Sequence, residues 1–494
     1  MSVVLGLDVS TTATKALLLG TEGRLVGAAS ASYPTSSPVP GWSEQDPDVW
    51  WDAAVTATRE VLSATDTPGD AVETVGIAGQ MHGLVVLDRQ LKTLRPAILW
   101  NDQRTGTECD LIREAVGAER LLAVTGNDAL TGFTAPKLIW VRDHEPEVWG
   151  QIAHILLPKD LVRLRLSGDL ATDPADGSGT LLMDLAERRW SPEILQALAI
   201  PAGWLPDLAE GPELTGTVSA AGAEATGLRA GTPIVGGGGD QAAAAVGVGA
   251  VRPGVLSVSL GTSGVVFATG PAPLVEPRGR LHAFCHAVPG RWHLMGVMLS
   301  AAGSLAWFRD TLAPGVSFEA LTEEAARVAP GCDGLTFLPY LTGERTPHPD
   351  PLARGAFVGL TSRHTRGHLT RAVLEGVAFG LRDSLELIHG MGLTAHEDGR
   401  ITGGGSRSPT WRQIVADVLA IPVVSMKTAE GAAFGAGVLA SVGAGWHDTV
   451  DAAVADAVRA DATTGVGDPG AYAAAYDRYR SLYPALAPTF HATP

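Results

Sequence analysis

Short apolar runs alternate with polar turns from the first residues of the chain. Residues 3–7 have the pattern of a buried strand, and residues 13–19 continue as a second strand after a turn rich in hydroxyl groups. A third strand follows the turn at residues 20–23. The pattern therefore predicts an antiparallel β-meander at the beginning of the chain.

The same arrangement occurs again halfway along the chain. Residues 255–260 predict a strand, residues 261–264 form a turn of Gly, Thr and Ser, and residues 265–269 predict a returning strand. Because two hydroxyl-rich hairpins each open one half of the chain, they indicate a duplicated domain. We expect an α/β protein with domains at residues 1–245 and 246–494 and a nucleotide held between them.

Helical spacing and strand-to-helix junctions fill most of the remaining sequence. A helix is predicted to begin at Pro47, with Asp46 as its N-cap. Residues 171–180 are rich in small polar side chains and predict a loop. A longer loop is predicted at residues 337–348, where Glu344 and Arg345 are expected to form an ion pair. Further helices are predicted over residues 106–116, 135–143, 300–310, 369–387, 410–419 and 431–443.

Four consecutive glycines, Gly236 to Gly239, stand between an apolar run and a helix of small residues, and Asp240 closes them. Glycine lets the backbone approach a bound molecule closely and adopt angles that other residues avoid. Two interpretations stay open from these residues alone. Asp240 either caps the helix that follows a tight turn, or it faces a space that the glycines keep clear for a ligand.

The turn after the first strand carries Asp8, Ser10, Thr11 and Thr12, with Lys15 in the following strand. Hydroxyl and amide groups in such a turn can donate to phosphate oxygens, and the carboxylate can hold hydrated Mg²⁺. The turn lacks the Gly-Lys-Ser/Thr signature of a P-loop. An ordinary hairpin turn is the alternative interpretation.

Two further polar clusters follow predicted strands. Met81 and His82 lie between glycines at the end of the strand at residues 75–78, where open α/β sheets bind ligands. Trp100 and Asp102 stand at the end of another strand, among groups suited to a polyhydroxylated ligand. A lone histidine in such a position is commonly structural, so a ligand contact and a packing role both stay open for His82.

Composition narrows the class of protein. A chain of 494 residues is longer than one hydrophobic core usually supports, which favours several domains. The net charge of −17 argues against a nucleic-acid-binding surface. Three cysteines far apart in the chain predict a reduced, cytoplasmic protein without a disulfide framework. We expect no membrane association, because the first residues lack a basic segment and no apolar run could span a bilayer.

Taken together and in this order, the motifs identify a family: the chain resembles the FGGY carbohydrate kinases from the first strand to the C-terminal helices. The resemblance implies two ribonuclease-H-like domains of the actin/hexokinase type that close on a central cleft. Within the family, the Met81-His82 pair favours xylulose over glycerol, ribulose or gluconate. The resemblance rests on residues 42–47, 79–83, 95–102, 134–138, 157–160, 236–249, 259–264, 284–286, 343–348 and 355–375.

The resemblance also implies a role for each candidate residue. Asp240 would be the general base, and Asp8 would lie near the metal ion and the phosphates. Ser10 and Gln241 depart from common family patterns, which have Gly and Asn at these positions. The implied sugar contacts are Met81, His82, Trp100, Asp102 and Gln241, and the implied nucleotide contacts are Ser10, Thr11, Thr12, Lys15, Gly261, Thr262, Ser263, Gly404 and Gly405.

The expected reaction is the transfer of a phosphoryl group from ATP, with Mg²⁺, to D-xylulose, and Asp240 would accept the hydroxyl proton. The expected partners are the sugar and MgATP, with neither nucleic acid nor membrane, and a homodimer is left open. Two alternatives stay open as well. One is a kinase for another ketose or polyol, and the other is a nucleotide-dependent binding protein on the same scaffold without sugar transfer.

Overall fold

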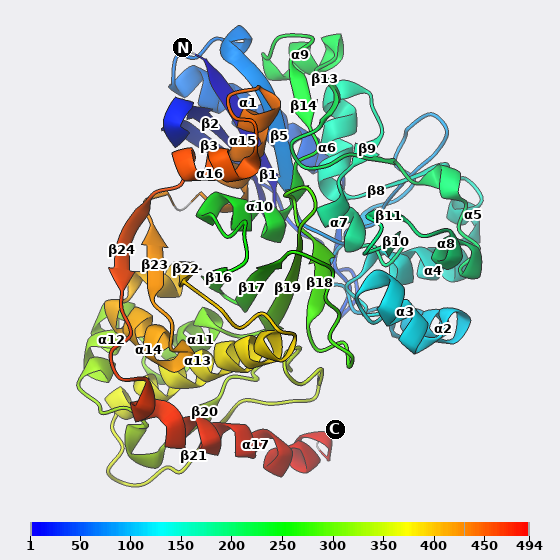
Figure 1. Ribbon diagram of the computed structural model, residues 1–494. Helices are drawn as coiled ribbons and strands as arrows, with labels where there is room; N and C mark the ends of the chain where they lie inside the picture. The colour runs from blue at the N-terminus through cyan, green and yellow to red at the C-terminus, as the bar shows by residue number, and fades with distance from the viewer. Residues whose placement is uncertain (1, 429, 493–494) are drawn as a thin grey trace.

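A seven-stranded mixed sheet in each half of the chain forms the framework of the computed structural model, which describes residues 2–428 and 430–492 (Figure 1). In the first sheet the predicted antiparallel meander is extended by two parallel strands and one antiparallel edge strand. Its spatial order is β13 (Leu214–Thr217), β14 (Pro233–Val235), β5 (Val72–Gly79), β1 (Val3–Val9), β2 (Ala13–Gly20) and β3 (Leu25–Ser32), and β15 (Gly238–Gly239) pairs with β5.

The second sheet repeats this order. Its meander of β16, β17 and β19 corresponds to β1, β2 and β3, because a parallel pair and an antiparallel edge strand again extend the first strand. The spatial order is β18 (His282–Cys285), β19 (Trp292–Met298), β17 (Gly264–Gly270), β16 (Val255–Leu260), β22 (Asp398–Thr402), β23 (Val423–Met426) and β24 (Ala460–Thr464). The predicted two-domain α/β fold is confirmed, and the boundary at residue 245 stays a prediction.

Helices cover both faces of the first sheet because alternate residues of its strands are apolar on both sides. Val3 and Leu5 pack with α1 in one core cluster, whereas Val4 packs with α15 in another. The helices on the first face are α1 (Asp48–Ala64), α6 (Pro158–Ser167) and α9 (Ala220–Thr226), and those on the second face are α10 (Asp240–Val248), α15 (Gly431–Gly443) and α16 (Val450–Ala457) (Figure 1).

The helices α10 and α15 cross with their backbones in direct contact. A Cβ atom on Gly435 would lie 1.7 Å from the carbonyl oxygen of Ala243, so only glycine fits at this point of α15. On the opposite side of α15, a Cβ atom on Gly6 of β1 would lie 2.1 Å from the carbonyl oxygen of Ala433. A helix from late in the chain therefore fixes the position of α10 against the first sheet.

A large core cluster surrounds the second sheet and the long helix α13. Its helices are α11 (Ala302–Leu312), α12 (Phe318–Ala326), α13 (Arg366–Gly390), α14 (Pro409–Leu419) and α17 (Ala473–His491). A side lobe, on the right of Figure 1, contains α2 (Gly106–Val116), α3 (Ala118–Thr125), α4 (Thr134–His144), α5 (Pro146–Trp149) and α8 (Pro192–Ala197). Short paired strands complete the fold: β4 (Glu44–Gln45) with β7 (Ala97–Ile98), β6 (Val85–Leu87) with β8 (His154–Leu156), β10 (Met183–Asp184) with β11 (Arg189–Trp190), and β20 (Thr336–Leu338) with β21 (Ala356–Val358).

Two local predictions need correction. The loop predicted at residues 171–180 is wrong, because this segment contains β9 (Ala171–Thr172), paired with β12 (Asp207–Leu208), and the short helix α7 (Pro174–Ser178). Asp173 caps α7, since its side chain accepts hydrogen bonds from two backbone N–H groups of the first turn. The helix predicted to begin at Pro47 begins one residue later, at Asp48, and Pro47 takes the N-cap position.

Within the part of the chain that the structure describes, no helix is both long enough and apolar enough to cross a bilayer.

Candidate active site

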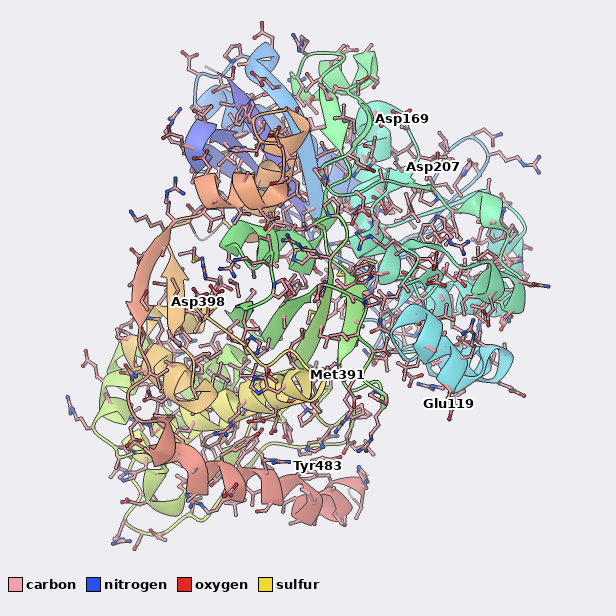
Figure 2. The ribbon with its side chains drawn as sticks, viewed as in Figure 1. Glu119, Asp169, Asp207, Met391, Asp398 and Tyr483 are labelled. Carbon is pink, nitrogen blue, oxygen red and sulfur yellow. The ribbon has the colours of Figure 1, made fainter. Side chains whose placement is uncertain are left out.

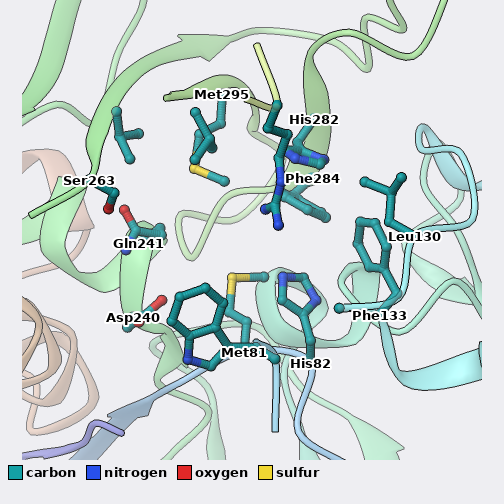
Figure 3. Close-up of a pocket in the computed structure, with 15 residues that line it drawn as sticks. Met81, His82, Leu130, Phe133, Asp240, Gln241, Ser263, His282, Phe284 and Met295 are labelled. Atoms are coloured by element: carbon teal, nitrogen blue, oxygen red, sulfur yellow. The ribbon is translucent and has the colours of Figure 1, made fainter. Parts of the chain in front are cut away.

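Two cavities hold most of the predicted site residues. The first cavity has a volume of about 180 Å³ and is enclosed by residues of both halves (Figure 3). The second cavity has a volume of about 820 Å³ and belongs to the second half alone. The first is lined by Met81, His82, Trp100, Leu130, Gly132, Phe133, Asp240, Gln241, Ser263, Val265, His282, Phe284, Met295, Val297 and Arg345. The predicted sugar contacts, with the exception of Asp102, therefore come together in the first cavity.

Asp240 is the first residue of α10 and faces the first cavity. The N-cap position belongs to Gly239, so the interpretation of Asp240 as the helix cap is wrong. Gly237 needs a left-handed φ of 70°, and a Cβ atom there would lie 1.8 Å from the carbonyl oxygen of Ile77. The glycine run thus lets the chain pass along the end of β5 and turn directly into the helix that carries the carboxylate.

The carboxyl group of Asp240 is easily protonated for an aspartate. Burial raises its pKa to about 7, and the negative charge of Asp8 adds to the shift. Asp8 lies at the end of β1, and burial likewise raises its pKa to about 6, opposed by the positive charge of Lys15. Asp240, the predicted base, and Asp8, the predicted metal ligand, are therefore close enough for their charges to interact.

Asp8 also satisfies a simple test for a metal ligand. Its Oδ1 atom is buried and has no hydrogen-bond partner among residues 2–428 and 430–492. A buried carboxylate oxygen without a donor is poorly solvated, and a cation would compensate it. Mg²⁺ is typically held by one or two carboxylates together with substrate phosphates and water. The residues present therefore fit a Mg²⁺ ion that arrives with a nucleotide.

His82 presents one defined nitrogen to the first cavity. Its Nδ1 atom lies 2.6 Å from the carbonyl oxygen of Gly179, just after α7, and must be the donor because a carbonyl only accepts. Burial lowers the pKa of His82 to about 3, so the ring is neutral and Nε2 carries a lone pair. Its backbone has a left-handed φ of 67°, held by Lys137 Nζ, which donates to the His82 carbonyl oxygen at 2.8 Å.

Trp100 and Asp102 occupy different surroundings although they are two residues apart. Trp100 is 39% exposed at the mouth of the first cavity, and its Nε1 donates to Thr11 Oγ1 at 3.0 Å. Asp102 is fully buried outside the cavity lining. Its carboxylate accepts hydrogen bonds from Nε and Nη2 of the Arg104 guanidinium, at 2.8 to 3.1 Å, and from the backbone N–H groups of Ser43 and Arg104. In this structure Asp102 holds its loop and does not contact the first cavity.

A buried cluster of charged side chains contacts the backbone at the beginning of the glycine run. Lys159 Nζ lies 2.6 Å from Asp160 and 2.8 Å from Asp173, and all three side chains are fully buried. In the same cluster, the Arg163 guanidinium donates to the carbonyl oxygens of Val235 and Gly236 at 2.8 and 2.6 Å. Sequence reasoning missed this cluster, because small polar residues around Asp173 are typical of a solvated loop.

The predicted nucleotide contacts are divided between two places. Gly261, Thr262, Gly404 and Gly405 line the second cavity, which the 3₁₀ turn at Gly404–Arg407 closes on one side. Ser263 lines the first cavity, so the turn after β16 borders both cavities. Lys15 is on β2, where its ammonium group forms a 2.9 Å ion pair with Glu430, just before α15. Ser10 Oγ donates within its own turn, to the Ala13 carbonyl oxygen at 2.8 Å, and the Thr12 carbonyl oxygen accepts from the Tyr33 N–H group.

The predicted ion pair between Glu344 and Arg345 is wrong. Glu344 Oε1 instead accepts hydrogen bonds from the backbone N–H groups of Leu299 and Arg345, at 2.9 and 2.8 Å. The Arg345 side chain is thereby free to line the first cavity. Two adjacent residues of opposite charge suggest an ion pair. The sequence alone does not distinguish an ion pair from a carboxylate that accepts hydrogen bonds from backbone N–H groups.

The loop that carries Arg345 is also anchored to the last helix. Asp350 Oδ2 accepts hydrogen bonds from Tyr483 Oη at 2.8 Å and from His491 Nε2 at 2.9 Å. His348 stacks on the Tyr483 ring with centroids 3.8 Å apart. Figure 2 shows Tyr483 on α17, at the lower edge of the second half. The shape of one wall of the first cavity therefore depends on the end of the chain.

The sequence and the structure of the chain were compared with known protein families, relatives and solved structures. Residues 3–247 match the N-terminal domain and residues 256–444 the C-terminal domain of the FGGY family of carbohydrate kinases. The chain is 46% identical to a xylulose kinase of Escherichia coli K12 over 84% of each chain, and 44% identical to one of Klebsiella pneumoniae over 90% and 91%. The crystal structure of xylulose kinase from Rhodospirillum rubrum superposes with a TM-score of 0.91, at 34% identity, over 99% of this chain and all of the other.

Proposed function

Because the chain belongs to the FGGY family of carbohydrate kinases, we propose that it transfers the γ-phosphoryl group of MgATP to the 5-hydroxyl of D-xylulose. The observation that carries the proposal is Asp240, a carboxylate of raised pKa in a cavity shared by both halves. The relatives named as xylulose kinases support the choice of sugar. Since both kinase domains match the chain, we set aside the alternative of a binding protein without sugar transfer.

Asp240 acts as the general base in this proposal. As the sugar hydroxyl oxygen forms its bond to the γ-phosphorus, the bond to the bridging oxygen of ADP breaks and Asp240 takes the hydroxyl proton. Raising the pKa to about 7 makes the carboxylate a stronger base while it is still largely ionised slightly above neutral pH. A Cβ atom on Gly239 would lie 2.7 Å from the Met81 Cγ atom, so glycine at this position lets the Met81 side chain pack directly beside Asp240.

The first cavity binds the sugar. His82 Nε2 offers an acceptor to a hydroxyl group, while Met81 and Phe133 provide apolar walls that exclude water. Trp100 covers the mouth, fixed by its hydrogen bond to Thr11 on the turn after β1. The sugar therefore contacts an element that also borders the proposed phosphate site, which brings donor and acceptor together.

The second cavity and the two turns bind the nucleotide. The backbone at Gly261 and Thr262 and the glycines Gly404 and Gly405 allow adenosine and phosphates to approach the main chain. Asp8 would hold Mg²⁺, which when bound neutralises charge on the β- and γ-phosphates. Lys15 is positioned to attract the phosphates, and its ion pair with Glu430 keeps it at the junction of the halves. The homodimer stays a prediction.

The variant Asp240→Asn tests the base. Turnover should fall by about 10²–10⁴-fold, because the amide cannot accept the proton, while calorimetry should show that D-xylulose and ATP still bind. Asp207→Asn, an exposed carboxylate labelled in Figure 2, is the matched control and should keep wild-type turnover. Near-normal turnover of Asp240→Asn would show that another group is the base. A panel of ketoses and polyols, assayed by ADP release, decides between D-xylulose and another substrate.

A further inference from the structure

Two polar side chains of the second half line the first cavity and have no role in the reaction as described so far. His282 is on β18 and Arg345 is in the loop after β20. Figure 3 shows His282 and Phe284 on the side of the cavity opposite Met81 and His82. His282 and Arg345 therefore line the proposed sugar site from the half of the chain that carries the second cavity.

The tautomer of His282 follows from its neighbour. Its Nδ1 atom lies 3.0 Å from Asn127 Oδ1. The Asn127 amide nitrogen donates to the carbonyl oxygen of Ala283 at 2.7 Å, so the oxygen is the Asn127 atom that faces the ring. His282 Nδ1 must then hold a proton and donate, which leaves Nε2 as an acceptor. That Nε2 atom is buried and has no partner among the described residues.

Arg345 is a cation in the same cavity without an acceptor of its own. No hydrogen bond or ion pair of its guanidinium occurs with any residue in the described ranges. Burial lowers the pKa of Arg345, opposed by the negative charge of Glu344. Its positive charge lowers the pKa of both His82 and His282, so the guanidinium lies near both rings. The loop is held firmly, since Thr346 Oγ1 donates to the Arg280 carbonyl oxygen and accepts from the Val297 N–H group.

We infer that Arg345 and His282 form the second half's contacts with the sugar and that they select a ketose. The Arg345 guanidinium donates a hydrogen bond to the C2 carbonyl oxygen, and His282 Nε2 accepts a hydrogen bond from a neighbouring hydroxyl group. A guanidinium only donates and a carbonyl only accepts, so the two groups complement each other without competition. A polyol has a hydroxyl at C2 whose proton finds no acceptor in the guanidinium, and it binds less well. The inference rests on the proposed function.

Direct binding of D-xylulose and xylitol, measured by calorimetry, tests this assignment. Xylitol is the matched ligand because it differs in having a hydroxyl where the ketose has a carbonyl. Arg345→Met removes every donor at similar length and should weaken D-xylulose binding about 10- to 100-fold. Its effect on xylitol should be clearly smaller, so the preference for the ketose should shrink. Arg345→Lys keeps a donor and should lie between wild type and Arg345→Met.

His282 is tested by a pair of variants. His282→Leu removes the acceptor and should weaken D-xylulose binding by about 2- to 10-fold, whereas His282→Gln can still accept and should restore part of the affinity. The control is His293→Gln, a buried histidine on β19 that is outside the cavity lining. The KM for ATP should stay within about twofold in every variant, since a general loss of structure would raise it too.

The outcomes separate this inference from the proposed function. A wild-type protein that neither binds nor phosphorylates D-xylulose overturns the proposed function, and the ketose assignment with it. A wild-type protein active on D-xylulose, with unchanged affinity in folded Arg345→Met and Arg345→Lys, overturns the inference alone. Equal losses for D-xylulose and xylitol overturn the contact with the carbonyl. Thermal unfolding of each variant identifies any that does not fold, and the lysine and glutamine variants then carry the test.

Discussion

The crossing of α10 and α15 predicts a large effect from one added methyl group. In Gly435→Ala the new Cβ atom would lie 1.7 Å from the Ala243 carbonyl oxygen, where ordinary contact begins near 3.4 Å. The helices would have to separate by about 1.7 Å at this point, because the opposing atom belongs to backbone and cannot rotate away. Overpacking of this kind typically costs about 1–3 kcal/mol of stability, partly offset by about 1 kcal/mol of improved helix propensity.

The displacement also reaches the proposed base. Ala243 is three residues after Asp240 on the same helix, so a shift of α10 moves the carboxylate relative to the sugar. A displacement of about 1 Å at a reacting group can cost about 10²-fold in rate. We therefore expect Gly435→Ala to lower the unfolding midpoint by a few degrees and kcat by one to two orders of magnitude, measured by differential scanning calorimetry and an ADP-release assay.

Gly437→Ala is the matched control, two residues along the same helix. Its Cβ atom would meet Leu17 and Leu19 at 3.5 Å, an ordinary contact, so the substitution should be neutral or slightly stabilising. If Gly435→Ala matched Gly437→Ala in both midpoint and kcat, the reasoning from backbone contact would be refuted.

Two other substitutions test the support of the site. Arg163→Met removes the donors to Val235 and Gly236 and leaves the buried carboxylates with one cation fewer. The free energy of unfolding should therefore fall by about 3–5 kcal/mol in denaturant titrations. The control is Arg165→Met, which breaks a partly exposed ion pair with Asp48 and should lower the free energy of unfolding by less than about 1 kcal/mol. Burial raises the pKa of Glu344 from 4.5 to about 8, so the folded state loses stability as the pH rises through that window. Glu344→Gln should therefore show a smaller fall in unfolding free energy between pH 5 and pH 9 than wild type, and an equal fall would contradict the buried ionisation.

The sequence was sufficient for elements whose side-chain pattern matches their burial. Strand β1 is a nearly continuous apolar run, and β16 alternates apolar residues with serine. Both strands are followed by hydroxyl-rich turns, and both hairpins form as predicted. The helix predicted over residues 431–443 is confirmed with the same bounds. These predictions succeed because the period of the apolar positions depends only on local geometry.

The sequence failed where polar residues are buried. Asp173 and Asp176 resemble loop residues, yet they are fully buried beside Lys159, which is adjacent only in the folded chain. Arg345 looked like the partner of Glu344 because the two are neighbours in sequence. Its place in the first cavity depends on how Thr346 pairs with β19, a contact between segments 49 residues apart. Single-sequence patterns contain no information on such pairings.

The anchoring of Asp350 by α17 affects how the protein should be prepared. Tyr483 and His491 lie 133 and 141 residues after Asp350, so nothing near the pocket in sequence reveals the dependence. Proteolytic removal of the last helix turns would remove both hydrogen-bond donors and loosen the Arg345 loop. Preparations that differ only at the C-terminal end should then differ in sugar affinity, and kinetic constants are comparable only between chains whose last helix is intact.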